Sequence, residues 1–303
     1  MSNPGSLIGT LQTAAGDIDI IGYVVWWNVR EVEASRDWFK ASLDTVGLDG
    51  ERYAREHNYR ATFIRCLRSL EEQRIIRKVK EDSGRLVFQF TAEKLIDDDP
   101  ENPHLEYTPE TVIEIDKSAY FTEGNFADAL IKCDAVLKPI LVEMFDKERQ
   151  TYRSGDLTRY IQRIFKDHAD IVSLREQGSV YFVPASFGNL VSQVAQVLET
   201  CPKGTAQLEF FPVPDAESSR SMVGHGVESE IVAIFTKMDD EIKKMKAGNT
   251  DITEKWVDHR QKKIREMRER LTMYSEVLGD TAQRLTGKFD AMSAGLTPRV
   301  LEI

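Results

Sequence analysis

Residues 257–278 of the sequence read VDHRQKKIREMRERLTMYSEVL. Apolar side chains recur there at spacings of three and four residues, which is the period of one face of an α-helix. The remaining faces are densely charged, so the stretch predicts a long amphipathic helix of the kind that forms coiled coils. The apolar seam continues along five residues: Ile264, Met267, Leu271, Tyr274 and Leu278.

A similar apolar pattern precedes this stretch, and Gly248-Asn249 separates the two. Thr250 or Asp251 can cap the second helix. We therefore predict a long antiparallel helical hairpin over residues 216–290, followed by a tail over 291–303. Two helices alone have a thin core, so covering the seam with a second copy or a partner protein is favourable. The seam is therefore the predicted oligomerisation surface.

The order of elements near the N-terminus predicts a winged-helix-like domain over residues 1–120. Residues 23–29 are rich in β-branched and aromatic side chains and predict a buried strand. Helical patterns follow at 31–46 and 60–73, and a strand, turn and strand follow at 75–90. In a winged helix-turn-helix the last of these helices is the recognition helix and the hairpin is the wing.

Positive charge is concentrated in the same segment. Residues 51–80 contain nine Lys or Arg and four Glu, a local charge of +5 in a chain of net charge −10. Arginine-rich helices bind base edges and phosphates, but they also occur as solvated or protein-binding surfaces, and the sequence leaves both readings open. The predicted nucleic-acid-binding residues are Arg60, Thr62, Arg65, Arg68, Lys78, Lys80 and Arg85.

The middle of the chain predicts a connector and a small mixed unit. Residues 121–153 are expected to contain one connector helix, which Pro139 could kink. Residues 154–215 predict an α-β-β-α-β unit whose helices are capped by Ser154 and Ser186. Together with the two flanking regions, this predicts an α+β fold.

The composition excludes several classes of protein. The chain has 303 residues, enough for two domains, and its sequence pI of about 5.2 is unlike that of a general nucleic-acid binder. Cys66, Cys133 and Cys201 are far apart and form no CxxC pair, so neither a disulfide framework nor a zinc site is predicted. Phosphate-loop, dinucleotide-binding and HExxH motifs are absent from the sequence. We expect a soluble cytoplasmic protein without enzymatic activity, cofactor or membrane segment.

Three stretches resemble an uncharacterised family of prokaryotic and phage-type proteins. They are Arg60-Ala61-Thr62, the segment from Ser173 to Pro184, and Tyr274 to Leu278. The resemblance covers most of the chain, and Val180-Tyr-Phe-Val-Pro184 is its most specific part. It implies one continuous architecture and an origin in a phage or mobile element, and it implies no catalytic residues.

Two functional hypotheses follow from these patterns. The first is a non-enzymatic protein that binds double-stranded DNA and oligomerises through its C-terminal coiled-coil hairpin. The second is a structural or assembly protein in which the winged helix and the coiled arm both contact protein partners and no nucleic acid is bound.

Overall fold

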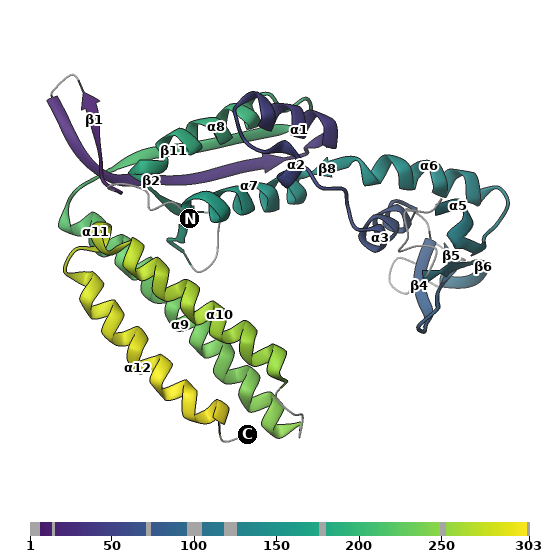
Figure 1. Cartoon of the computed structure of the whole chain (residues 1–303). Helices are drawn as coiled ribbons and strands as arrows, with labels where there is room; N and C mark the ends of the chain where they lie inside the picture. The colour runs from purple at the N-terminus through teal and green to yellow at the C-terminus, as the bar shows by residue number, and fades with distance from the viewer. Residues whose placement is uncertain are drawn as a thin grey trace. The chain divides into compact units, whose positions relative to one another are not determined.

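The computed structural model describes residues 7–13, 16–70, 74–95, 105–117, 126–175, 180–248 and 253–301. Helices and antiparallel sheets are both present, so the predicted α+β class is confirmed. The chain forms two compact units (Figure 1). The first unit is drawn from Met1–Val32, Ser42–Asp49 and Ser154–Ile303, and the second from Glu33–Ala41 and Gly50–Arg153. Within the described residues, no helix is both long and apolar enough to cross a membrane.

The long strand β2 (Gly16–Arg30) is the centre of the sheet in the first unit (Figure 1). One edge of β2 pairs first with β1 (Gly9–Thr13) and then with β10 (Val180–Pro184), which in turn pairs with β9 (Val172–Ser173). Its other edge pairs with β11 (Thr205–Pro214). All of these pairings are antiparallel.

This topology corrects two predicted boundaries. The strand expected at residues 23–29 lies in β2, so it belongs to the sheet with β10 and β11 and not to the domain that contains the Arg-rich helix. Residues 154–215 are likewise not a separate unit, because β2 lies between β10 and β11. The physical reason is that Val24 and Val25 point to opposite faces and both are buried, as expected for a strand covered on both sides.

Helices α7 (Ser154–Ala169) and α8 (Gly188–Glu199) accompany this sheet. Ser154 was predicted as a helix cap, but its Oγ accepts a hydrogen bond from the Val32 N–H at 3.1 Å. The 3₁₀ turn Ala185–Phe187 precedes α8, so Ser186 does not cap it either. On β2, the Trp27 ring stacks on Phe165 of α7 and, 4.9 Å between ring centres, on Tyr181 of β10.

The described part of the C-terminal region contains three long helices, not the two predicted. They are α9 (Glu217–Ala247), α10 (Glu254–Met273) and α12 (Thr281–Leu301), with the short α11 (Ser275–Leu278) before the last. Gly279 takes a positive φ of 56° and ends α11, and α12 returns along α9 (Figure 1). The predicted tail from residue 291 is therefore helical as far as Leu301. The predicted caps Thr250 and Asp251 lie outside the described residues, and Thr253 caps α10.

The predicted oligomerisation seam lies inside this bundle. Met267, Leu271, Tyr274 and Leu278 are buried, and Ile264 packs against the same core. Their neighbours include Phe289 of α12 and Val24 and Phe182 of the sheet. This assignment has to be corrected: the third helix and the sheet cover the seam within one chain, so these residues are not free to contact a second copy.

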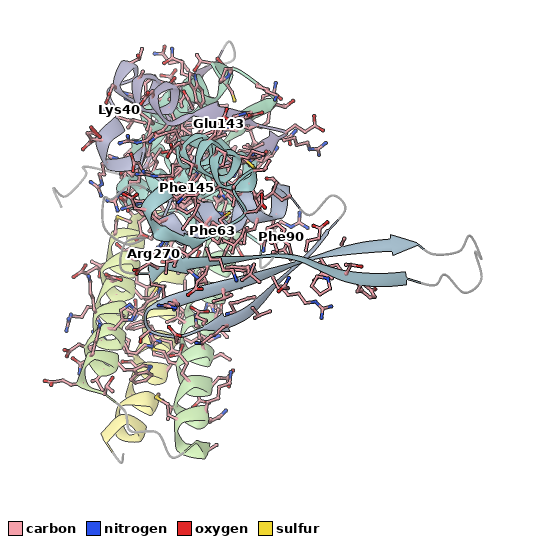
Figure 2. The ribbon with its side chains drawn as sticks, turned by 90° about the vertical axis from the view of Figure 1, so that its right-hand side faces the viewer. Lys40, Phe63, Phe90, Glu143, Phe145 and Arg270 are labelled. Atoms are coloured by element: carbon pink, nitrogen blue, oxygen red, sulfur yellow. The ribbon has the colours of Figure 1, made fainter. Side chains whose placement is uncertain are left out.

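One buried arginine joins the bundle to the sheet. Arg270 of α10, labelled in Figure 2, pairs through Nη1 with Glu230 of α9, and its Nη2 lies 2.9 Å from Asp170 Oδ1. The same guanidinium donates to the backbone carbonyls of Asp170 and Ile171. Burial favours the neutral form of Arg270, but the carboxylates of Glu230 and Asp170 outweigh it and raise the pKa of the side chain. It therefore remains a cation that holds α9, α10 and the start of β9 together.

Replacing Arg270 should destabilise the protein strongly. Arg270→Leu removes the buried cation that pairs with Glu230 and Asp170 and leaves two backbone carbonyls without their donor. We expect the free energy of unfolding to fall by about 3–5 kcal/mol. Urea unfolding followed by circular dichroism measures this. Arg268→Leu is the matched control, because Arg268 pairs with Asp290 on the surface, where ion pairs contribute little. Equal losses in the two variants would contradict the role given to Arg270.

The second unit has its own sheet, in the order β4-β5-β6-β7. These strands are β4 (Arg74–Glu81), β5 (Arg85–Leu95), β6 (Leu105–Asp116) and β7 (Leu130–Lys132). The accompanying helices are α2 (Gly50–Tyr53), α3 (Tyr59–Ser69), α5 (Phe126–Ala129) and α6 (Leu137–Arg149), and α1 (Arg36–Thr45) begins in this unit. The strands β3 (Glu33–Ser35) and β8 (Thr151–Arg153) pair separately. Phe63, Phe90 and Phe145 lie together in the core of this unit (Figure 2).

The single connector helix predicted for residues 121–153 is replaced by α5, β7 and α6. Asp134 explains where α6 begins, since its Oδ1 accepts hydrogen bonds from the N–H groups of Val136 and Leu137. Pro139 then lies in the first turn of α6, where a missing N–H costs no helical hydrogen bond. Pro139 is therefore compatible with the beginning of α6 and does not kink the helix.

Candidate nucleic-acid interface

The Arg-rich helix α3 is amphipathic. Asn58 caps it by accepting a hydrogen bond from the Ala61 N–H at 3.2 Å. Phe63, Cys66 and Leu67 point into the core of the second unit. Burial raises the pKa of the Cys66 thiol to about 12, so this cysteine is a packing residue and not a reactive thiol.

The hairpin β4–β5 turns at residues 82–84. Asp82 Oδ1 accepts hydrogen bonds from the N–H groups of Gly84 and Arg85, at 3.0 and 2.7 Å. These two bonds lower the pKa of Asp82, so it stays charged and holds the turn closed. The hairpin is therefore a well-defined surface beside α3.

A groove of about 250 Å³ lies between α3 and the hairpin. Its floor is apolar and comes from both elements, while its rim carries three cations. The lining residues are Arg60, Ile64, Leu67, Arg68, Ile76, Lys78, Leu86 and Phe88. The structure thus brings together three of the residues predicted from sequence to bind nucleic acid: Arg60, Arg68 and Lys78.

Glu81 organises the cations at this groove. Its carboxylate lies 2.6 Å from Lys78 Nζ, 3.0 Å from Lys117 Nζ and 3.4 Å from Arg60 Nη2. Hydrogen bonds from Lys78 and Lys117 lower the pKa of Glu81 from its ordinary 4.5 to about 2. One negative charge therefore holds three positive ones, and the cluster keeps a net positive charge.

The other predicted residues divide into two groups. Lys80 and Arg85 are exposed, but each has a local acidic partner, Asp82 at 3.2 Å and Glu114 at 2.7 Å. Thr62 is 0% exposed, and its hydroxyl donates to the Asn58 carbonyl, so it cannot contact a ligand without unfolding α3. Arg65 is half-buried, with Nη1 3.1 Å from His57 Nε2. The assignment of Thr62 is therefore wrong, whereas that of Arg65 stays a prediction.

The prediction from sequence missed one residue that the structure places at this surface. Lys117 follows β6 and reaches Glu81. Lys117 is far from the Arg-rich segment in sequence, so only the pairing of β5 with β6 could have revealed it.

Comparison with known proteins identifies a family. The model of a family of unknown function, DUF6744, matches residues 20–300. The chain belongs to the DUF6744 family. The match runs from β2 into α12, so both units are part of the DUF6744 architecture, in agreement with the expected resemblance to an uncharacterised family. No curated protein and no solved structure matches the chain.

The charge state of Glu81 can be measured by following its side-chain carboxyl resonance with pH. We expect a midpoint near pH 2, because Lys78 and Lys117 stabilise the carboxylate. The folded pKa is depressed, so the stabilising contribution of Glu81 is present above pH 4.5 and is lost as the pH falls toward 2.

Lys78→Ala should raise that midpoint, since Lys78 is the strongest partner of Glu81. Lys80→Ala is the control, because Lys80 pairs with Asp82 in the adjoining turn and not with Glu81. A midpoint near 4.5 in the unmodified protein would show that the cluster does not form.

Proposed function

We propose that this protein is a non-enzymatic nucleic-acid-binding protein that contacts double-stranded DNA with α3 and the β4–β5 hairpin, in the manner of a winged helix. The observation that carries the proposal is the groove between these two elements, whose rim is formed by Arg60, Arg68 and Lys78. A helix beside a hairpin can place one element in a major groove while the other follows the phosphate backbone.

The electrostatics favour a polyanionic ligand. Arg68 is exposed, and no ion pair within the described residues engages it. Arg60 and Lys78 are held by Glu81, and a phosphate can take the place of that carboxylate without further desolvation. The net charge of −10 opposes non-specific association elsewhere on the molecule, so binding is confined to this local patch.

A second candidate function rests on the floor of the same groove. Ile64, Leu67, Leu86 and Phe88 offer an apolar strip between basic rims, which suits an acidic peptide with apolar side chains. In that case the protein is an assembly or interaction protein and does not bind nucleic acid. We further propose that the protein self-associates, lies in the cytoplasm and originates from a phage or mobile element. The contact between copies is not made by the C-terminal seam, which is buried within one chain.

Removing the three rim cations should abolish most DNA binding. For Arg60→Ala/Arg68→Ala/Lys78→Ala we expect a large loss of affinity for duplex DNA, measured by fluorescence anisotropy. We also expect the slope of log K against log salt to become shallower by about 2–3, since each phosphate contact contributes about 0.9.

The matched control replaces three exposed lysines of the bundle, Lys237, Lys243 and Lys262, by alanine. It has the same change in net charge and should bind DNA like the unmodified protein. Glu81→Gln should act in the opposite sense and tighten binding, because it releases the rim cations. Equal losses in the two triple variants, or no binding of DNA by the unmodified protein at low salt, would contradict the proposal and favour the peptide-binding alternative.

A further inference from the structure

The strand β11 is an edge strand of the sheet in the first unit, and α8 packs against it. Among the described strands it pairs only with β2, along which it lies in Figure 1. Its sequence TAQLEFFPVP contains one charged residue, Glu209, and no lysine or arginine. Long apolar edge strands are usually protected by charges, bulges or a covering element, since their free backbone groups readily pair with another strand.

The direction of the backbone groups follows from the neighbouring strands. Leu174 N donates to the Val180 carbonyl at 3.0 Å, so Val180 turns its backbone groups toward β9. Backbone groups alternate in direction along a strand, so Tyr181 turns toward β2 and bonds to Val25, its register partner. The backbone N–H and C=O groups of Val25 therefore point toward β10.

The same alternation continues across β2. Because the backbone groups of Val25 point toward β10, those of Val24 and Trp26 point toward β11. There the register pairs Val24 with Phe211 and Trp26 with Glu209. The intervening residues of β11 must then point their N–H and C=O groups to the free edge: Ala206, Leu208, Phe210 and Pro212. Pro212 has no N–H to donate, which agrees with this outward position.

The exposed aromatic rings of the first unit gather at this edge. Phe210 is 42% exposed and lies 6.0 Å from the Tyr23 ring, while Phe211 is 49% exposed and lies 5.9 Å from Trp26. The two phenylalanines project from opposite faces of the sheet. Two adjacent exposed phenylalanines beside unpaired backbone donors are typical of a surface that becomes covered.

We propose that two copies of this protein join edge to edge through β11, as antiparallel strands related by a two-fold axis at Leu208. In this register Ala206 and Phe210 of one copy exchange backbone hydrogen bonds with Phe210 and Ala206 of the other, and the two Leu208 residues bond to each other. The sheets of the two copies become one continuous sheet.

The side chains favour this register over the two registers whose axes lie nearer Pro212. A two-fold axis at Leu208 sets Gln207 opposite Glu209 of the other copy, which pairs an amide with a carboxylate. An axis at Glu209 would set two carboxylates directly opposite each other, which destabilises a strand pair. An axis at Phe210 would set Pro212 opposite Leu208 and lose a donor. With the axis at Leu208 the prolines fall just beyond the paired residues and end the ladder.

This association goes beyond the proposed function and does not depend on it, because β11 belongs to the first unit and the candidate groove to the second. It also replaces the predicted C-terminal seam, which is closed within each chain.

Gln207 offers a matched pair of variants, since its side chain is exposed and makes no core contact. Sedimentation equilibrium of the full chain should show a dimer. Gln207→Glu places like charges opposite each other twice per dimer and should raise the dimer Kd about tenfold, whereas Gln207→Lys should lower it by a similar factor. A monomer at all concentrations, or equal Kd values for the two variants, would overturn the proposal.

Phe210→Pro tests the backbone pairing directly. The substitution removes a backbone N–H that points to the free edge and makes no hydrogen bond to β2. The monomer should therefore keep its circular dichroism spectrum while the dimer is lost. Phe210→Ala, which removes the ring but keeps the N–H, should weaken the dimer less than Phe210→Pro. A dimer that survives Phe210→Pro unchanged would overturn the proposal and point to another face. Duplex-DNA affinity of the monomeric variant, measured separately, reports on the groove alone.

Discussion

The buried guanidinium of Arg270 is the interaction on which the first unit depends. It joins α10 to Glu230 of α9 and to Asp170 and Ile171, where α7 ends and β9 begins. Tyr274 adds a hydrogen bond to the Asp170 carbonyl at 3.0 Å, and Glu230 accepts the Ser173 N–H. A charge buried this deeply is tolerated only with all of these partners in place. The bundle and the sheet are therefore coupled, and the apolar C-terminal seam is closed inside one chain.

The local elements were predictable because they follow from side-chain periodicity. The strand around Val24 and Val25, the helix α3 and the helix that carries Met267 and Leu271 all appear where the pattern indicates. What the pattern does not specify is pairing over long sequence distances. Nothing in the spacing of residues 23–29 indicates that this strand pairs with residues near 180 and 210. Gly279 alone likewise does not predict that the chain reverses direction there and continues as a third long helix.

The candidate site shows the same limit at the level of single side chains. Composition located the positive segment, and the groove contains Arg60, Arg68 and Lys78 from it. Composition could not show that Thr62 faces the core, because a threonine in an Arg-rich helix fits either face. Nor could it show that Glu81 and Lys117 meet, since that contact depends on how β4, β5 and β6 pair. The ion pairs of the site therefore depend on the pairing of the strands, which the composition does not show.

Within the described residues the C-terminal seam is closed inside one chain, so the contacts proposed for partners lie elsewhere, at the β11 edge and the α3–hairpin groove. Amide hydrogen exchange along α10, measured at high and at low protein concentration, tests this most directly. The account predicts slow exchange around Met267 and Leu271 that is the same at both concentrations, because the helix is covered by α9, α12 and the sheet. Protection of α10 that disappears on dilution would show instead that its seam is covered by a second copy.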